Sequence, residues 1–191
     1  MDSTVVDRLY TEFSDLLTVL EKKDELSLRS VADDNFRKAL LMAAASYFEK
    51  RMSEEVLNFT AAVTTETHVL TCLVRNKVIS RQYHTWFDWK NKNINKFFYL
   101  FGKEFQSWMK DVVKREPDLD SSIQAFLEIG RERNRLVHND YGNFPLEKTF
   151  EEIYALYKNS TKFVECFPNA LKKFTENNRE ERASAQCLPG S

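Results

Sequence analysis

The chain has 191 residues, of which 42% are hydrophobic and 13% aromatic, so it is long enough and apolar enough for one domain with a buried core. Its 28 basic residues nearly balance its 29 acidic ones, and the formal net charge of −1 excludes a protein that binds nucleic acid through its overall charge. Any contact with RNA or DNA must come from a local basic patch.

The cysteine content and the length of the apolar runs indicate in which cellular compartment the protein is found. Cys72, Cys166 and Cys187 are odd in number and widely spaced, so we expect free thiols in a reducing compartment. No apolar run approaches the roughly 18 residues of a membrane span. The chain has no paired-cysteine, HExxH or glycine-rich phosphate motif, so we expect no metal and no other cofactor. These features predict a cytoplasmic protein that does not enter a membrane.

Apolar spacing predicts three helices in the first part of the chain. Apolar residues follow helical spacing without a miss over 4–23, which predicts an amphipathic helix. Asp33 or Asp34 can cap a second helix that continues to about Phe59. A third helix is expected over 65–80.

An aromatic segment of little helical order, YHTWFDWKNKN at residues 83–93, leads into a fourth predicted helix over 94–114, and Pro117 breaks that helix. The segment admits two interpretations. Its rings can stack on nucleic-acid bases while Lys90 and Lys92 follow phosphates, or the rings can plug one end of the helical core while the lysines face solvent. The core-like spacing of the phenylalanines that follow favours the second interpretation.

Asp120 or Ser121 can cap a fifth helix, which runs into the charged segment GRERNRLVHNDYG at residues 130–142. The segment ends in the turn cluster NDYGNFP. Because Glu128, Arg131, Glu132 and Arg135 fall outside the apolar sector at about 100° per residue, we expect them on a solvated face.

Thr149 and Glu152 form a capping box for the last helix, which we expect Pro168 to interrupt. No segment shows the alternation of a strand, and no internal repeat is present. The sequence therefore predicts an all-α protein, an up-and-down bundle of five to six helices. We expect one domain over residues 1–175 and a polar, disordered C-terminal tail over residues 176–191.

Arg133 is the residue of the charged segment that needs an explanation. The apolar sector of the fifth helix consists of Ile123, Phe126, Ile129, Leu136 and Val137. Arg133 projects among these residues, with Asn134 and His138 at the edge. A buried guanidinium is costly unless it is paired, so either Glu49 or Glu55 of the second helix pairs with it or this face handles phosphate. The helix dipole also favours cations at this end.

The segment resembles the HEPN superfamily of helical bundles, whose ribonuclease members carry an arginine, four to six residues and then a histidine, often with an asparagine directly after the arginine. Here the sequence is RNRLVH over residues 133–138, ahead of the final helix. The stretch WFDWKNKNINKFFYLFGKEF, residues 86–105, is similar to the RiboL-PSP-type HEPN proteins, in which an aromatic segment leads into such a helix. The similarity covers roughly residues 5–175, and it implies a HEPN-like bundle.

The resemblance implies a metal-independent endoribonuclease that pairs as a homodimer and brings two of these motifs into one cleft between subunits. Arg133 would then bind the scissile phosphate, His138 would transfer protons, and Asn134 would orient the ring or the phosphate. Glu49 matches the position at which some families place a supporting polar residue. The residue types suit this chemistry, since histidine titrates near neutrality and arginine keeps its charge.

The substrate-binding residues that we expect are Arg131, Arg135, Lys90 and Lys92 for phosphates and Tyr141 for stacking on a base. The resemblance further implies a toxin or effector of a toxin–antitoxin or antiviral defence system, which an antitoxin or inhibitor protein would hold silent. Two alternatives stay open. The bundle could bind RNA, nucleotides or a partner protein without cleaving, or it could be a structural adaptor in which the motif arginine pairs with a carboxylate inside one subunit.

Overall fold

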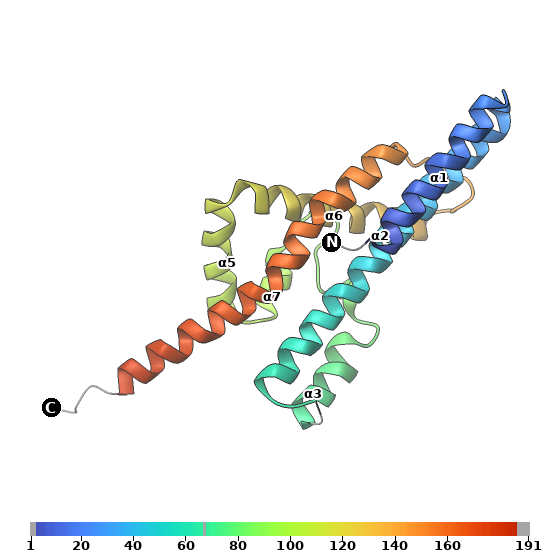
Figure 1. Ribbon diagram of the computed structural model, residues 1–191. Coiled ribbons are helices and arrows are strands. Elements are labelled where there is room, and N and C mark those ends of the chain that lie inside the picture. The colour runs from blue at the N-terminus through green and yellow to red at the C-terminus, as the bar shows by residue number, and fades with distance from the viewer. Residues whose placement is uncertain (1–2, 67, 187–191) are drawn as a thin grey trace.

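The computed structural model describes residues 3–66 and 68–186, with side chains up to Asn178 (Figure 1). In this part of the chain the regular elements are all helical, apart from an isolated bridge between Asp88 and Asn93, and the predicted all-α bundle is confirmed. The long helices are α1 (Val5–Lys22), α2 (Leu26–Val63), α5 (Lys103–Arg115), α6 (Pro117–His138) and α7 (Phe150–Gln186). The short ones are α3 (Val69–Leu73), a π-helical turn η1 (Val74–Ile79), a 3₁₀ turn η2 (Tyr83–Thr85) and α4 (Asn95–Tyr99).

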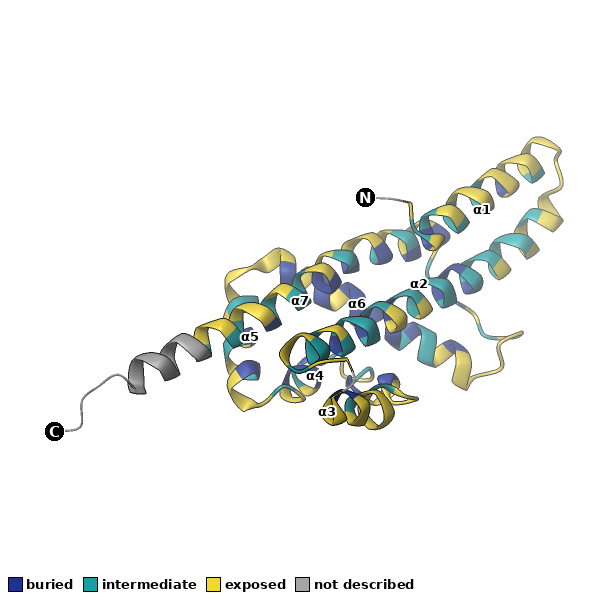
Figure 2. Ribbon diagram, turned by 60° about the horizontal axis from the view of Figure 1, so that its bottom comes forward, coloured by how far each residue is buried: buried dark blue, intermediate teal, exposed yellow. Residues whose placement is uncertain are grey.

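Helix α6 occupies the centre of the fold, where it packs on α2, α5 and α7. Eleven of its residues are buried, and in its middle they lie on every side of the helix. Helix α2 spans about 57 Å at 1.5 Å per residue, and α1 packs along it as the second arm of a long hairpin (Figure 1). Buried residues gather where these helices meet, while the end of the α1–α2 hairpin is mostly exposed (Figure 2).

Helix α2 begins at Leu26, earlier than the sequence predicted. Asp33 and Asp34 do not cap it, because both lie inside the helix. Each carboxylate forms an ion pair with a basic residue one helical turn later, Asp33 with Arg37 at 3.1 Å and Asp34 with Lys38 at 2.8 Å. Acidic residues one turn before basic ones support a helix interior as well as they signal a start, so the pattern alone could not fix the boundary.

The fourth predicted helix is divided at Gly102 into α4 and α5. Gly102 has a φ of 102°, a left-handed conformation that only glycine adopts without strain, and it precedes the first residue of α5. The third predicted helix forms over most of its expected length, although its second half is π-helical. The apolar periodicity therefore placed these segments correctly and missed the turn between two helices.

Pro117 begins α6 instead of only ending the helix before it, so the prediction that Asp120 or Ser121 caps this helix is wrong. A proline fits the first helical position because the amide that it lacks would have no partner there. Asp118 and Asp120 lie in the first turn, where carboxylates interact favourably with the helix dipole.

The predicted capping box of α7 is confirmed, since the amide of Thr149 donates to Glu152 at 2.7 Å and the amide of Glu152 donates to the Thr149 hydroxyl at 3.1 Å. The expected interruption at Pro168 is wrong, because this residue lies inside α7. The helix continues to Gln186, so residues 176–186 are helical where we expected disorder. The end of the expected tail, residues 187–191, lies outside the described residues.

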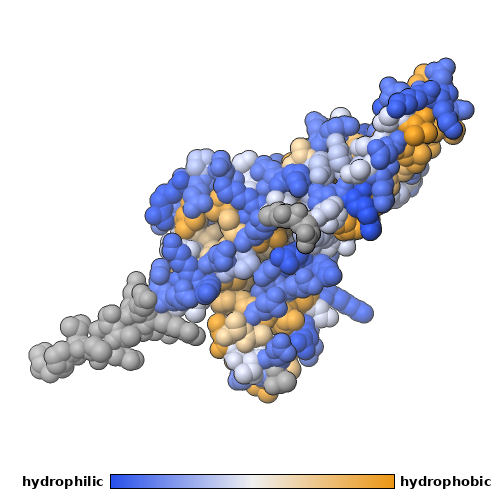
Figure 3. All heavy atoms as spheres, in the orientation of Figure 1, coloured by the Kyte–Doolittle hydropathy of each residue, from blue (hydrophilic) through white to orange (hydrophobic). Residues whose placement is uncertain are grey.

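Two further expectations concern thiols and membranes. Cys72 and Cys166 are free thiols, as expected, and Cys187 lies outside the described residues. Among the described helices, none combines the length and the apolar character that a membrane span requires. Apolar side chains are nevertheless exposed at the end of the α1–α2 hairpin and around α3 (Figure 3).

Ser122 joins the two central helices. It is fully buried on α6, and its hydroxyl donates to the Asn159 carbonyl at 2.6 Å and accepts from the Phe163 amide at 2.8 Å. These two backbone groups stand four residues apart in α7, the spacing at which a helix bonds to itself. The Ser122 hydroxyl therefore bridges a carbonyl and an amide of the neighbouring helix.

We expect Ser122→Ala to lower the free energy of unfolding by about 1–3 kcal/mol, because the Asn159 carbonyl and the buried Phe163 amide both lose their hydrogen bond to the Ser122 hydroxyl. Ser121→Ala is the matched control, since Ser121 is exposed and should change stability by less than about 0.5 kcal/mol. Urea denaturation of the two variants measures the difference. Equal stabilities would contradict a structural role for the Ser122 hydroxyl.

Asp7 links α1 to α7 through a side-chain hydrogen bond. It completes a capping box with Thr4, and its carboxylate accepts a hydrogen bond from the Tyr154 hydroxyl at 2.8 Å. Burial raises the pKa of Asp7, but hydrogen bonds from the Thr4 amide, Tyr154 and the Thr4 hydroxyl outweigh it, and the pKa falls to about 2 from an ordinary 3.8. The ionised carboxylate is therefore stabilised in the folded protein.

Because the folded pKa of Asp7 is depressed, its contribution is present above the unfolded pKa and is lost as the pH falls through the folded value. At 1.36 kcal/mol per pKa unit, the loss between about pH 4.5 and pH 2 is about 2 kcal/mol. We expect this part of the pH dependence of stability to be absent in Asp7→Asn and present in Glu12→Gln, an exposed carboxylate on the same helix. Denaturant titrations across this range provide the measurement, and identical slopes for the two variants would contradict the assignment.

Candidate functional site

Two hollows flank the C-terminal half of α6. The first is a small cavity of about 20 Å³ between α2, η2 and α6. Its polar lining residues are Glu49 from α2, Tyr83 and His84 from η2, and Arg133 and Asn134 from α6. Residues from three separate elements thus converge beside the motif arginine.

The second hollow is an open groove of about 660 Å³ beside α6 and the aromatic segment. Its basic lining residues are Lys90, Lys96, Arg131, Arg135 and His138, and one carboxylate, that of Asp88, also lines it. Asn134 and Trp89 line both hollows, so they separate the cavity from the groove. The groove is a local basic patch on a chain with almost no net charge.

Arg133 is half-buried and has no ion-pair partner within 4.0 Å in the described part of the chain. Its guanidinium donates one hydrogen bond, to the side-chain oxygen of Asn134 at 3.1 Å. Of the two carboxylates considered from the sequence, Glu55 pairs with Arg51 at 3.0 Å, and Glu49 lines the cavity with an exposed side chain. The guanidinium therefore keeps most of its donors for another partner.

His138 is the last residue of α6 and is exposed in the groove. It does not line the cavity that Arg133 lines. Within one chain the two motif residues thus belong to neighbouring hollows, with Asn134 between them. Both residues are accessible from solvent, as contact with a polynucleotide requires.

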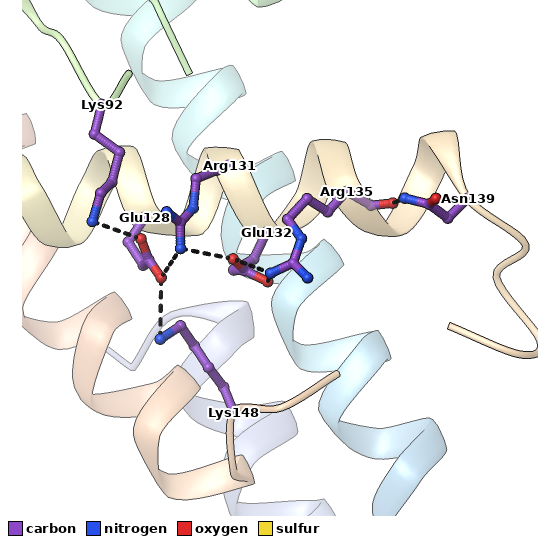
Figure 4. Close-up of polar contacts among 7 residues, drawn as sticks. All are labelled: Lys92, Glu128, Arg131, Glu132, Arg135, Asn139 and Lys148. Carbon is purple, nitrogen blue, oxygen red and sulfur yellow. Dashed lines mark hydrogen bonds and ion pairs between the residues drawn. The ribbon is translucent and has the colours of Figure 1, made fainter. Parts of the chain in front are cut away.

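Glu128 and Glu132 are buried, with 8% and 3% of their surface exposed, so their predicted place on a solvated face is wrong. Figure 4 shows how the buried carboxylates are paired: Arg131 contacts Glu128 at 2.9 Å and Glu132 at 3.2 Å, and Arg135 contacts Glu132 at 3.0 Å. Val137 of the same helix departs from its prediction in the opposite direction. The sequence placed it in the apolar sector, but it is 39% exposed.

Two lysines from other segments complete this network. Lys92 and Lys148 each lie 3.1 Å from the Glu128 carboxylate (Figure 4). Burial raises the pKa of Glu128, but the hydrogen bonds from Lys92 and Lys148 outweigh it, and the pKa is lowered. The network therefore holds the aromatic segment and the loop that leads into α7 against α6, and Lys92 is already paired within it. Arg131 stays one-third exposed at the groove.

The aromatic segment is mainly core. Trp86 and Phe87 are buried and stack on Phe97, which confirms the interpretation that these rings plug the helical core. Trp89 stays half-buried between the two hollows, and its ring nitrogen donates to the carbonyl of His84 at 2.9 Å.

Gly130 makes room for that ring. A Cβ at this position would lie 2.0 Å from Trp89, closer than any real contact. Sequence reasoning missed this pair, although a glycine inside a helix is a recognised sign that another group approaches closely. Tyr83 and Lys96 belong to the aromatic, lysine-rich segment that the sequence singled out, but no local signal placed either residue beside the motif on α6.

Tyr141 is exposed and lines neither hollow. The ammonium of Lys38 on α2 lies over its ring, 5.5 Å from the ring centre. Arg37 of the same helix donates to the carbonyl of Leu146 at 2.8 Å. The segment that follows His138 is thus anchored to α2.

One of the comparisons with known proteins identifies a family. The RiboL-PSP-HEPN family matches residues 7–173, a range that contains both hollows and every residue of the buried network. No curated protein and no solved structure matches the chain. The family match confirms the resemblance seen in the sequence, and the chain belongs to the RiboL-PSP-HEPN family.

Proposed function

We propose that this HEPN protein is a metal-independent endoribonuclease whose catalytic residues are Arg133 and His138, with Asn134 orienting them. The observation that carries the proposal is the state of Arg133. Its guanidinium is half-buried, has no carboxylate partner among the described residues, and lies next to a groove lined by four basic side chains and His138. A partly buried cation without a counter-charge is costly, and a phosphate is the counter-charge that the neighbouring basic groove favours.

In the proposed reaction the 2′-OH of a ribose attacks the adjacent phosphodiester. A bond forms between the 2′-oxygen and phosphorus, and the bond between phosphorus and the 5′-oxygen breaks. An imidazole takes the 2′-OH proton, and an imidazolium returns a proton to the leaving 5′-oxygen, roles worth about 10²–10⁴ in rate. The guanidinium stabilises the charge that develops on the phosphate oxygens. The products are a 2′,3′-cyclic phosphate and a 5′-OH.

The groove gives the RNA strand a path to this site. Lys90, Lys96, Arg131 and Arg135 line it and can neutralise successive phosphates. Lys92 contributes indirectly, because its pairing with Glu128 holds the aromatic segment in place. Tyr141 lies outside the groove, so a base could reach its exposed ring only beyond the groove's end.

We propose that the active enzyme is a homodimer. Arg133 and His138 of one chain line different hollows, so a second copy that faces the same end of α6 would bring a guanidinium and an imidazole together. Val137 and Tyr141, which are 39% and 46% exposed, leave apolar surface beside the motif for such a contact.

Unrestrained cleavage of RNA would harm the cell that makes the enzyme. We therefore propose a toxin or effector of a toxin–antitoxin or antiviral defence system, held silent by an antitoxin or inhibitor protein. Expression should arrest growth, and His138→Ala should relieve the arrest. Growth arrest that persists in this variant would contradict an RNA-cutting toxin.

The decisive experiment incubates the purified protein with total RNA in the presence of EDTA and identifies the new ends. Fragments that carry 2′,3′-cyclic phosphate and 5′-OH ends support the proposal. RNA that is retarded in a gel but stays uncut would show a HEPN module that binds without cleaving. The absence of any interaction with RNA would contradict both the ribonuclease and the module that binds RNA without cleaving it.

A further inference from the structure

Tyr83 is a buried residue of the cavity that the sequence motif does not include. It is the first residue of η2, is 8% exposed, and lines the cavity together with Arg133 and Glu49. Its ring packs against Trp86, Phe87 and Trp89. Its hydroxyl makes no hydrogen bond to any residue that the structure describes.

The hydroxyl of the other buried tyrosine, Tyr157, is paired, and so is that of the half-buried Tyr154. The Tyr157 hydroxyl lies 2.7 Å from that of Thr4, and the Tyr154 hydroxyl donates to Asp7 at 2.8 Å. Buried polar groups almost always have a partner, since an unpaired one costs about 1–3 kcal/mol. The Tyr83 hydroxyl has no such partner among the described residues. It keeps contact with solvent at the cavity, so a group from outside the chain can accept its hydrogen bond.

The electrostatic surroundings of Tyr83 make its hydroxyl a donor. Burial raises the pKa of Tyr83 well above its ordinary value, the charge of Glu49 raises it further, and the charge of Arg133 lowers it. The phenol therefore keeps its proton at neutral pH and lies within electrostatic reach of the guanidinium. Glu49 is the carboxylate of the cavity, and its exposure lets solvent and salt screen its charge.

The size of the cavity limits what it can hold. About 20 Å³ is room for roughly one oxygen atom, the space that a single water needs. Two of the residues that line this space carry hydrogen-bond donors of fixed character, Arg133 its guanidinium and Tyr83 its hydroxyl. A group that places one negatively charged oxygen inside and keeps its bulk outside satisfies both, and a phosphate does so with one of its non-bridging oxygens.

We propose that the Tyr83 hydroxyl donates a hydrogen bond to a non-bridging oxygen of the phosphate that Arg133 holds, which makes Tyr83 a further substrate-binding residue. The inference rests on the proposed function, because that phosphate is the one in the RNA to be cut. Tyr83 would bind the phosphate without exchanging a proton with it. It therefore adds a third donor to the arginine and histidine of the sequence motif.

Tyr83→Phe tests the inference, because it removes the hydroxyl and keeps the packed ring. The probe is uridine 3′-monophosphate, whose binding to the full-length protein is measured by titration calorimetry. We expect wild-type protein to bind the probe and Tyr83→Phe to weaken binding by about 10–100-fold, as for a hydrogen bond to a charged group. The melting temperature should stay the same or rise, since no protein partner is lost. Tyr157→Phe is the matched control, with a lower melting temperature and unchanged binding.

The outcomes separate this inference from the proposed function. Probe binding that is equal in wild type and Tyr83→Phe overturns the inference even if the enzyme cuts RNA. A fall in melting temperature equal to that of Tyr157→Phe, with binding unchanged, shows a structural hydroxyl and overturns it as well. No saturable binding of the probe by wild type also overturns it. Binding that depends on Tyr83 in a protein that leaves RNA uncut supports the phosphate site and contradicts the ribonuclease.

Discussion

Arg133→Ala is expected to lower the rate of RNA cleavage by at least about 10²–10³-fold, the usual effect of removing a donor that stabilises transition-state charge. His138→Ala should lower it by about 10²–10⁴-fold through the loss of proton transfer. Single-turnover cleavage of a labelled RNA measures both effects. Arg8→Ala and His68→Ala are the matched controls, because these exposed residues lie outside both hollows and should leave the rate unchanged.

The same variants separate catalysis from stability. Arg133 makes one hydrogen bond, to its neighbour Asn134, and no ion pair within the described chain, so Arg133→Ala should change the free energy of unfolding by less than about 1 kcal/mol. A structural adaptor would behave in the opposite way. A loss of about 3 kcal/mol or more with RNA cleavage intact would show that the arginine supports the fold and would remove it from the catalytic site.

Gly130→Ala is expected to destabilise the protein by about 1–3 kcal/mol and to weaken RNA cleavage, since the new Cβ would lie 2.0 Å from the Trp89 ring. Whether Gly130→Ala lowers or raises the free energy of unfolding distinguishes the two possibilities. In a helix interior, alanine is more favourable than glycine by about 1 kcal/mol, so without the contact this substitution would stabilise α6. Because Trp89 separates the cavity from the groove, a displaced ring should alter both hollows.

Gly142→Ala is the control for this substitution, because the nearest atom to its Cβ would be Asp140 Oδ1 at 3.7 Å, an ordinary contact. Urea denaturation followed by tryptophan fluorescence reports both stability and the environment of the ring. A more stable Gly130→Ala protein with wild-type cleavage would contradict the packing of Trp89 on α6.

The helical class and the motif could be read from the sequence because both are local. Apolar periodicity marks helices without knowledge of what they pack against, and Arg133, Asn134 and His138 follow one another on a single helix. Helix boundaries were harder, since a proline can end one helix and begin the next. Pro117 stands at the first position of α6, and Pro168 lies inside α7 without ending it.

The rest of the site depends on contacts between distant segments, which no local pattern records. Glu128 and Glu132 have the spacing of a solvated face but are buried, and Lys92 and Lys148 reach Glu128 from elsewhere in the chain. In the sequence, Tyr83 is one more ring of an aromatic core. Only the structure shows that it has an unpaired hydroxyl and lines the same cavity as Arg133. Burial and charge pairing had to come from the structure.

The central claim is that a guanidinium and an imidazole from two copies of the chain act on one phosphodiester. Mixing inactive Arg133→Ala and His138→Ala proteins, after dissociating and reassociating their subunits, tests it most directly. We expect the mixture to regain RNA cleavage to at least about tenfold above either variant alone, because each mixed dimer holds one intact arginine and one intact histidine. A mixture that stays as inactive as its components, beside a wild-type enzyme that cuts RNA while sedimenting as a monomer, would contradict it.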